Sequence, residues 1–291
     1  MVMLPQRSVQ VDGRSVHLLD VGEGVSVVLE TGAGGSAAAW WRVMQPLALH
    51  VRAVAVDRPG AGWSDPGPEV LPGEIADRLH KALDAAGVPP PYLLVGHSLG
   101  GFHVRAFAAR YPGETAALLL VDPSHERMHE AFGLPGLRQR ALMAALTGAM
   151  SMLSVLRVRP LLSVLVAPRR LLSLLFDEEQ TRRLVRRQMC TPTAVRAAKN
   201  ERDSVPRACA QIAALIEDPG LPVRVLSAAA LSSRDRRSGP RDAINALHRE
   251  LARSRVDGQH QVCAGTTHMM PIEHPDVVVD AVLALAKART A

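Results

Sequence analysis

Cysteine and aromatic residues are scarce in this 291-residue chain, which holds three cysteines and only 3% aromatic residues. The cysteines, Cys190, Cys209 and Cys263, are widely spaced and form no Cys-x-x-Cys pair. This spacing indicates neither a zinc site nor a disulfide framework, so we expect no metal site. The glycine patterns of dinucleotide and phosphate sites are missing from the strand–helix turns, so we expect no cofactor either.

The chain also lacks a long apolar run and a basic leader. Its most apolar stretch, Ala141–Leu156, is interrupted by Thr147, Ser151 and Ser154 and is short for a bilayer span. The first residues, MVMLPQRSVQVDG, contain no basic segment followed by a continuous apolar core, so we expect no signal peptide. These absences predict a soluble, cytoplasmic protein.

Lysine is nearly absent, although the chain carries a formal charge of +6. Arginine supplies most of the positive charge, and it is scattered along the chain, mostly near Asp or Glu in the sequence. Because no basic block is interleaved with aromatic residues, we expect no nucleic-acid partner. The segment Arg157–Leu175 is rich in Arg and Leu, which is typical of helices that bind membrane surfaces. Association with a membrane surface is therefore a less favoured alternative. The sequence does not indicate an oligomeric state.

Short strand-like runs alternate with helical runs along most of the chain. The strands that we predict are Ser8–Val11, Ser15–Asp20, Val25–Leu29, Val51–Val56, Tyr92–Val95, Ala116–Val121, Pro222–Ser227 and Gln259–Cys263. The helices that we predict between and after them are Ala37–Leu49, Glu74–Ala86, Leu99–Arg110, Arg241–Arg253 and Pro275–Arg289. This alternation predicts an α/β fold with a doubly wound, mostly parallel sheet.

Residues 123–218 depart from the alternation and contain only helical patterns, rich in Leu, Met, Ala and Arg. We therefore predict a core formed by residues 1–122 and 219–291, interrupted by a helical cap at 123–218. The apolar faces of the cap helices need partners, which are first the core and then an apolar substrate.

A serine stands where one predicted strand turns into a helix. The strand Tyr92–Val95 is followed by Gly96-His97-Ser98-Leu99-Gly100 and then by a helical run. Glycines on both sides of a serine allow a tight turn that exposes its hydroxyl at the edge of the sheet. Ser98 is therefore the predicted nucleophile, and the backbone N–H of Leu99 is a predicted donor to an oxyanion.

Four segments together resemble the α/β-hydrolase superfamily, over nearly the whole length of the chain; they are Leu29–Ser36, Val56–Ser64, Gly96–Gly100 and Gly265–His268. The resemblance implies a Ser-His-acid triad and a second oxyanion donor, the backbone N–H of Ala33. The family usually has His-Gly where this chain has Thr31-Gly32. Because the implied donor is a backbone group, the loss of that histidine does not remove it. Asp57 and Arg58 are expected to hold a tight turn by hydrogen bonds.

His268 is the predicted general base, because it follows a strand and a loop of small residues, where the family carries its base. His274 is the nearest alternative in the sequence and precedes Pro275, at the expected start of a helix. His97 and His103 flank Ser98 and are expected to pack locally.

The acid of the triad has two candidates. Most family members carry it after the strand that follows the helical insertion, but Pro222–Ser227 is followed by Ala-Ala-Ala-Leu, and Asp235 comes only later among arginines. Asp122 directly follows the predicted strand Ala116–Val121, and one group of haloalkane dehalogenases carries its acid at this place. We favour Asp122 and keep Asp235 as the alternative.

A serine nucleophile argues against epoxide hydrolase and haloalkane dehalogenase chemistry, which both use an aspartate there. The leading hypothesis is hydrolysis of an ester of a small apolar substrate through an acyl-enzyme on Ser98. Other serine-triad reactions stay open on this fold: hydrolysis of a thioester, amide, lactone or carbon–carbon bond, acyl transfer, and cofactor-free peroxidation. A non-catalytic binder of a small ligand is a different class, and the presence of both Ser98 and His268 argues against it.

Overall fold

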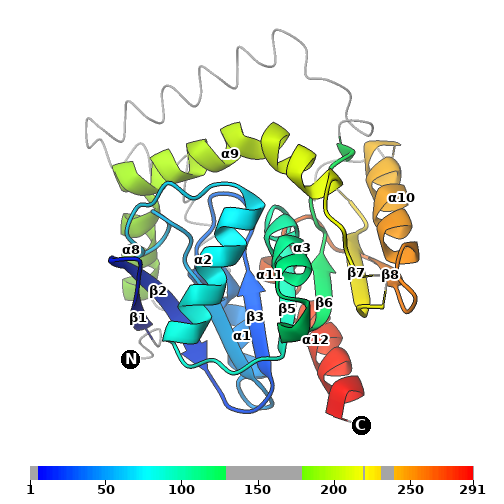
Figure 1. The fold of residues 1–291 in the computed structure, drawn as a ribbon, viewed down its shortest axis with the longest axis horizontal. Coiled ribbons are helices and arrows are strands. Elements are labelled where there is room, and N and C mark those ends of the chain that lie inside the picture. Colours follow the sequence, from blue (N-terminus) through cyan, green and yellow to red (C-terminus); the bar gives the residue numbers. More distant parts are fainter. Residues whose placement is uncertain (1–5, 129–178, 219, 231–238, 291) are drawn as a thin grey trace, which may run out of the picture.

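One eight-stranded sheet forms the centre of the computed structural model, which describes residues 6–128, 179–218, 220–230 and 239–290 (Figure 1). The strands are β1 (Gln6–Val11), β2 (Arg14–Val21), β3 (Ser26–Glu30), β4 (Arg52–Val56), β5 (Tyr92–His97), β6 (Thr115–Val121), β7 (Val223–Ala228) and β8 (Gln259–Cys263). Their order across the sheet is β1-β2-β4-β3-β5-β6-β7-β8. β2 runs antiparallel to both neighbours, and the other pairings among the described strands are parallel.

Helices cover both faces of the sheet, and the central strands are therefore buried on each side. The short helix η1 (Ala37–Trp40), α1 (Trp41–Leu47) and α12 (Pro275–Thr290) pack into one apolar core with Leu29, Leu93 and Leu119. The opposite core contains residues of α2 (Pro72–Ala85), α3 (Gly100–Arg110) and α10 (Gly239–Arg253). Two further short helices among the described residues are η2 (Pro112–Glu114), which has no buried residue, and α11 (Met270–Glu273).

Two described helices lie in the chain between β6 and β7. They are α8 (Glu179–Met189) and α9 (Pro192–Ala213), and α9 crosses over α2 and α3 (Figure 1). The hydroxyl of Thr191 accepts a hydrogen bond from the backbone N–H of Ala194 and so caps the start of α9. Both helices fall within the predicted cap. Residues 129–178 of that cap lie outside the described residues, so its bounds at 123 and 218 stay a prediction.

The predicted fold class is confirmed, and each predicted strand is found within two residues of its expected ends. The single helix predicted at Ala37–Leu49 is wrong in detail, because the segment is divided into η1 and α1. Within the described ranges, no helix combines the length and apolar character that a membrane span requires. The cytoplasmic location stays a prediction.

Candidate active site

Ser98 lies in the sharp turn between β5 and α3, at the carboxyl edge of the sheet. Its φ of +53° is a strained value for a residue with a side chain. Both flanking glycines are required by close approaches: a Cβ on Gly96 would stand 2.6 Å from the carbonyl oxygen of Gly100, and one on Gly100 would stand 2.3 Å from that of Glu30. The sequence therefore folds here into the tight strand–turn–helix element that it predicted.

The structure brings Ser98, His268 and Asp122 together in a hydrogen-bonded row. Nε2 of His268 lies 3.1 Å from Oγ of Ser98, and Nδ1 of His268 lies 2.7 Å from Oδ2 of Asp122. These distances fit a hydroxyl that donates to Nε2 and an Nδ1–H that donates to the carboxylate. The three residues come from the ends of β5 and β6 and from the loop after β8, which meet at one edge of the sheet.

Asp122 is buried and receives several donors at once. Its Oδ1 accepts the backbone N–H of Ala228, and its Oδ2 accepts Nη1 of Arg241 from α10, both at 3.0 Å. Burial opposes ionisation of Asp122, but the hydrogen bond from His268 and the charge of Arg241 outweigh it and hold the pKa of the carboxyl well below its usual range. The group is therefore an anion at neutral pH, as an acceptor for His268 must be.

His97 holds the backbone of the loop that carries His268. Its Nε2 donates to the carbonyl oxygen of His268 at 2.8 Å, and the two rings lie 4.8 Å apart. Burial and the neighbouring charge of His268 lower the pKa of His97 to about 4. His97 is thus neutral at neutral pH and fixes the loop without adding a charge beside His268.

The loop after β3 lies against Ser98, as the predicted oxyanion role of Ala33 requires. A Cβ on Gly32 would stand 3.1 Å from Cβ of Ser98. Among the described residues, the backbone N–H groups of Ala33 and Leu99 have no hydrogen-bond acceptor. Two backbone N–H groups that donate to no other described residue, on the two segments next to a serine, are the arrangement that an oxyanion needs.

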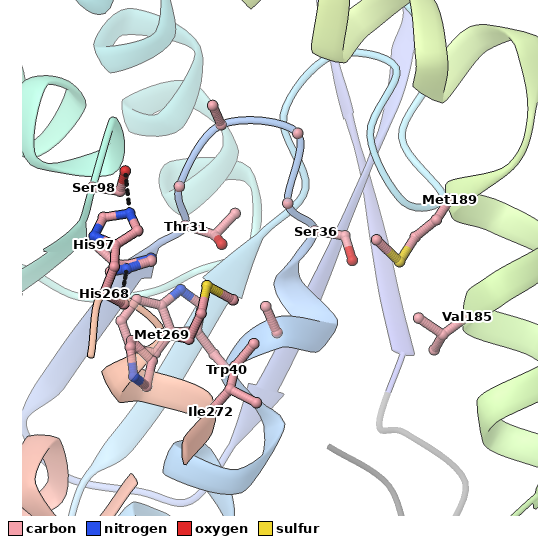
Figure 2. A pocket seen from close by; sticks show the side chains of 16 residues that line it. Thr31, Ser36, Trp40, His97, Ser98, Val185, Met189, His268, Met269 and Ile272 are labelled. Carbon is pink, nitrogen blue, oxygen red and sulfur yellow. Dashed lines mark hydrogen bonds between the residues drawn. The ribbon is translucent and has the colours of Figure 1, made fainter. Parts of the chain in front are cut away.

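An apolar cavity of about 410 Å³ opens beside Ser98 and His268. Figure 2 shows those two residues at one end and side chains of α8, Val185 and Met189, at the other. The apolar side chains of Trp40, Met269 and Ile272 also line the cavity. A second hollow of about 250 Å³ also reaches Ser98 and is lined by Met128, Arg241 and Ile244, among others. Ser98 thus has space beside it for two parts of a substrate.

Asp57 makes the hydrogen bonds expected of it, whereas the prediction that the side chain of Arg58 holds the same turn is wrong. Asp57 accepts from the backbone N–H groups of Ala37 and Trp63 and so holds its own turn. Arg58 instead donates to the carbonyl oxygens of Thr31 and Gly32 in the loop after β3. The sequence carried no signal for this second contact.

Arg241 was not predicted as a site residue, and the expectation of no metal site left out a His-Glu-x-x-His pattern at residues 125–129. No sequence motif predicts the role of Arg241, because its contact with Asp122 depends on how α10 packs against the sheet. The pattern is typical of a zinc-binding helix, but residues 123–127 are not helical and both Glu126 oxygens accept from Arg105. His129 lies outside the described residues, as does the alternative acid Asp235.

Comparison with known proteins agrees with this fold. A sequence model described as the alpha/beta hydrolase fold matches residues 25–204. Among curated proteins, the chain is 37% identical over 120 residues to a 2-hydroxy-6-oxo-2,4-heptadienoate hydrolase of Pseudomonas putida, covering 40% of this chain and 43% of that protein. It is 36% identical over 104 residues to a pimeloyl-[acyl-carrier protein] methyl ester esterase of Chromobacterium violaceum, covering 36% and 39%. Each match spans less than half of the relative's own length.

Solved structures resemble the chain over nearly its whole length. Cfl2 of Burkholderia cenocepacia has a TM-score of 0.71 and 23% identity, with 96% of this chain and 94% of that chain covered. A thermophilic esterase of Thermogutta terrifontis has a TM-score of 0.67 and 21% identity, with 98% and 99% covered. At these identities the likeness supports the fold alone.

Proposed function

The chain belongs to the alpha/beta hydrolase fold family, and on that premise we propose that it is a serine hydrolase that cleaves an ester of a small apolar substrate. Ser98 is the nucleophile, His268 the general base, Asp122 the acid, and the backbone N–H groups of Ala33 and Leu99 bind the oxyanion. The observation that carries the proposal is the hydrogen-bonded row from Asp122 through His268 to Ser98, which ends beside an apolar cavity.

In the first half of the reaction, Oγ of Ser98 attacks the ester carbonyl carbon while Nε2 of His268 takes the hydroxyl proton. The carbonyl oxygen becomes an oxyanion that accepts from Ala33 and Leu99. When the carbon–oxygen bond to the alcohol breaks, His268 returns the proton to the leaving oxygen. The acyl group is then an ester of Ser98.

In the second half, a water molecule gives a proton to His268 and its oxygen attacks the acyl carbon. A second oxyanion forms and collapses, the bond to Ser98 breaks, and His268 returns the proton to Oγ. Asp122 stays ionised throughout and stabilises the imidazolium that forms in both halves. The products are a carboxylic acid and an alcohol, and the enzyme is restored.

A panel of p-nitrophenyl esters from acetate to palmitate tests the reaction and the apolar cavity together. Each methylene that leaves water is worth about 0.8 kcal/mol, so kcat/KM should rise about fourfold per methylene until the acyl chain fills the cavity. Beyond that length it should stop rising. Ser98→Ala and His268→Ala should abolish turnover, whereas a folded wild-type protein that is inactive on the whole panel would contradict ester hydrolysis.

A further inference from the structure

The carboxylate of Glu201 lies against the loop after β3, although Glu201 belongs to α9. Its side chain is buried, and its Oε2 accepts the backbone N–H of Gly34 at 2.7 Å. Its Oε1 accepts Nε of Arg58, also at 2.7 Å. Neither Glu201 nor Arg58 lines the cavity beside Ser98, so neither is in place to touch a substrate there.

Arg58 holds the same loop from its other end. Its Nη1 donates to the carbonyl oxygen of Thr31 and its Nη2 to that of Gly32, each at 2.7 Å. The loop is therefore fixed at residues 31, 32 and 34, and the N–H of Ala33 between them is left without an acceptor among the described residues. The fixed points on either side determine where that N–H points.

α9 is also in close contact with the loop. Gly34 has a φ of +68°, and a Cβ placed on it would stand 3.2 Å from Cβ of Ala198, one turn before Glu201 on α9. Burial opposes ionisation of Glu201, but the charge and hydrogen bond of Arg58 outweigh it, and the pKa of the carboxyl is lowered. Glu201 is thus a buried anion with both oxygens engaged, which holds α9 and the loop in one arrangement.

We propose that Glu201 is a positioning residue for the oxyanion-binding N–H of Ala33, so that α9 sets the geometry of the oxyanion hole. This inference rests on the proposed serine hydrolase function. Displacing a group by about 1 Å in an active site can cost 10²-fold in rate, and removing a whole oxyanion donor costs about 10²–10³ in kcat. Loss of Glu201 therefore acts on the transition state and leaves substrate binding nearly unchanged.

The test compares Glu201→Ala and Glu201→Gln with Glu217→Ala on p-nitrophenyl butyrate. Glu217 is the matched control: it accepts from Arg105 of α3 in another largely buried Arg–Glu pair, and it does not contact the loop. In Glu201→Ala, Arg58 keeps Glu30 as a counter-ion, which favours folding. Urea midpoints of all variants establish that each is folded. Butaneboronic acid, which forms a tetrahedral adduct on a nucleophilic serine, reports on the oxyanion hole without turnover.

We expect Glu201→Ala to lower kcat by about 10- to 100-fold while KM changes by less than about threefold. Glu201→Gln, which keeps one acceptor oxygen, should lie between Glu201→Ala and wild type. The Ki of butaneboronic acid should rise in step with the loss of kcat/KM. Glu217→Ala should retain kcat within about twofold.

Two results would overturn the inference, and they differ. If wild type is active but Glu201→Ala and Glu217→Ala have the same kcat, the proposed function stands and the role of Glu201 is wrong. If folded wild type neither hydrolyses the ester nor binds the boronic acid, the proposed function fails and the role of Glu201 fails with it.

Discussion

At the scale of single residues, Asp122 is the point on which the proposed chemistry depends. It follows β6 directly, has a φ of +41°, and is held by donors from three segments: Ala228, Arg241 and His268. These contacts stabilise its anion in a buried place, where an unpaired charge would be costly. The Asp122 carboxyl is therefore ionised and can only accept at Oδ2, which places the ring proton of His268 on Nδ1.

The substitution Asp122→Asn tests this assignment against the alternative, Asp235→Asn. An asparagine of the same shape would favour the wrong tautomer of His268, so kcat should fall by about 10³–10⁴-fold, as the general behaviour of such triads indicates. Asp235→Asn should leave kcat within about twofold of wild type. Steady-state kinetics on p-nitrophenyl butyrate measures both, and the reverse pattern would assign the acid to Asp235.

At the scale of secondary-structure elements, α8 forms the far wall of the cavity of about 410 Å³. Val185 and Met189 project from α8 toward the cavity, while Met269 and Ile272 come from the segment after β8 (Figure 2). The second hollow has its own methionine, Met128. Met189 in the larger cavity and Met128 in the second hollow therefore form a matched pair for testing which of the two spaces holds the acyl chain.

Met189→Trp should shift the optimum of the ester panel to shorter acyl chains, because the indole fills volume that the chain would use. Met128→Trp should leave the optimum for p-nitrophenyl esters in place. The measurement is kcat/KM for each chain length in wild type and both variants. A shift in Met128→Trp alone would move the acyl chain to the second hollow.

The elements that the sequence predicted are those whose signals are local. The central strands are specified by short apolar runs, and the tight turn at Ser98 is specified by the glycines around it. Because both signals lie in consecutive residues, the strands and the turn were predictable from the sequence. Arg241 and Glu201 were not, because each acquires its partner only when its helix packs on the core. Asp122 is intermediate: its place at the end of β6 was predictable, but its contacts with α10 were not.

At the scale of the whole molecule, two of the buried histidines among the described residues, His97 and His248, make the fold sensitive to acid. Burial is the main cause that lowers the pKa of both His97 and His248 to about 4, from an ordinary value of 6.5. Below pH 6.5 the unfolded chain binds protons at these residues, whereas the folded chain does so only near pH 4. The free energy of unfolding should therefore fall as pH decreases from 6.5 to 4, by about 2 kcal/mol per histidine at pH 5.

His248→Asn should make this fall smaller, whatever it does to stability at neutral pH. The exposed Leu49 provides the control, because Leu49→Asn introduces the same side chain without removing a titrating group. Urea unfolding at about pH 7 and pH 5 gives the free energy of unfolding for wild type and both variants. Equal pH dependence in wild type and His248→Asn would contradict the explanation.

Whether Ser98 is an activated nucleophile is tested most directly by covalent labelling of the folded protein with a fluorophosphonate, in which Oγ of an activated serine displaces fluoride from phosphorus. Intact mass and peptide mapping count the adducts and locate them. We expect one adduct, on Ser98, which is absent from Ser98→Ala and forms far more slowly in His268→Ala. A folded wild-type protein that stays unlabelled, or a label that persists in Ser98→Ala, would contradict the assignment of Ser98 as the nucleophile.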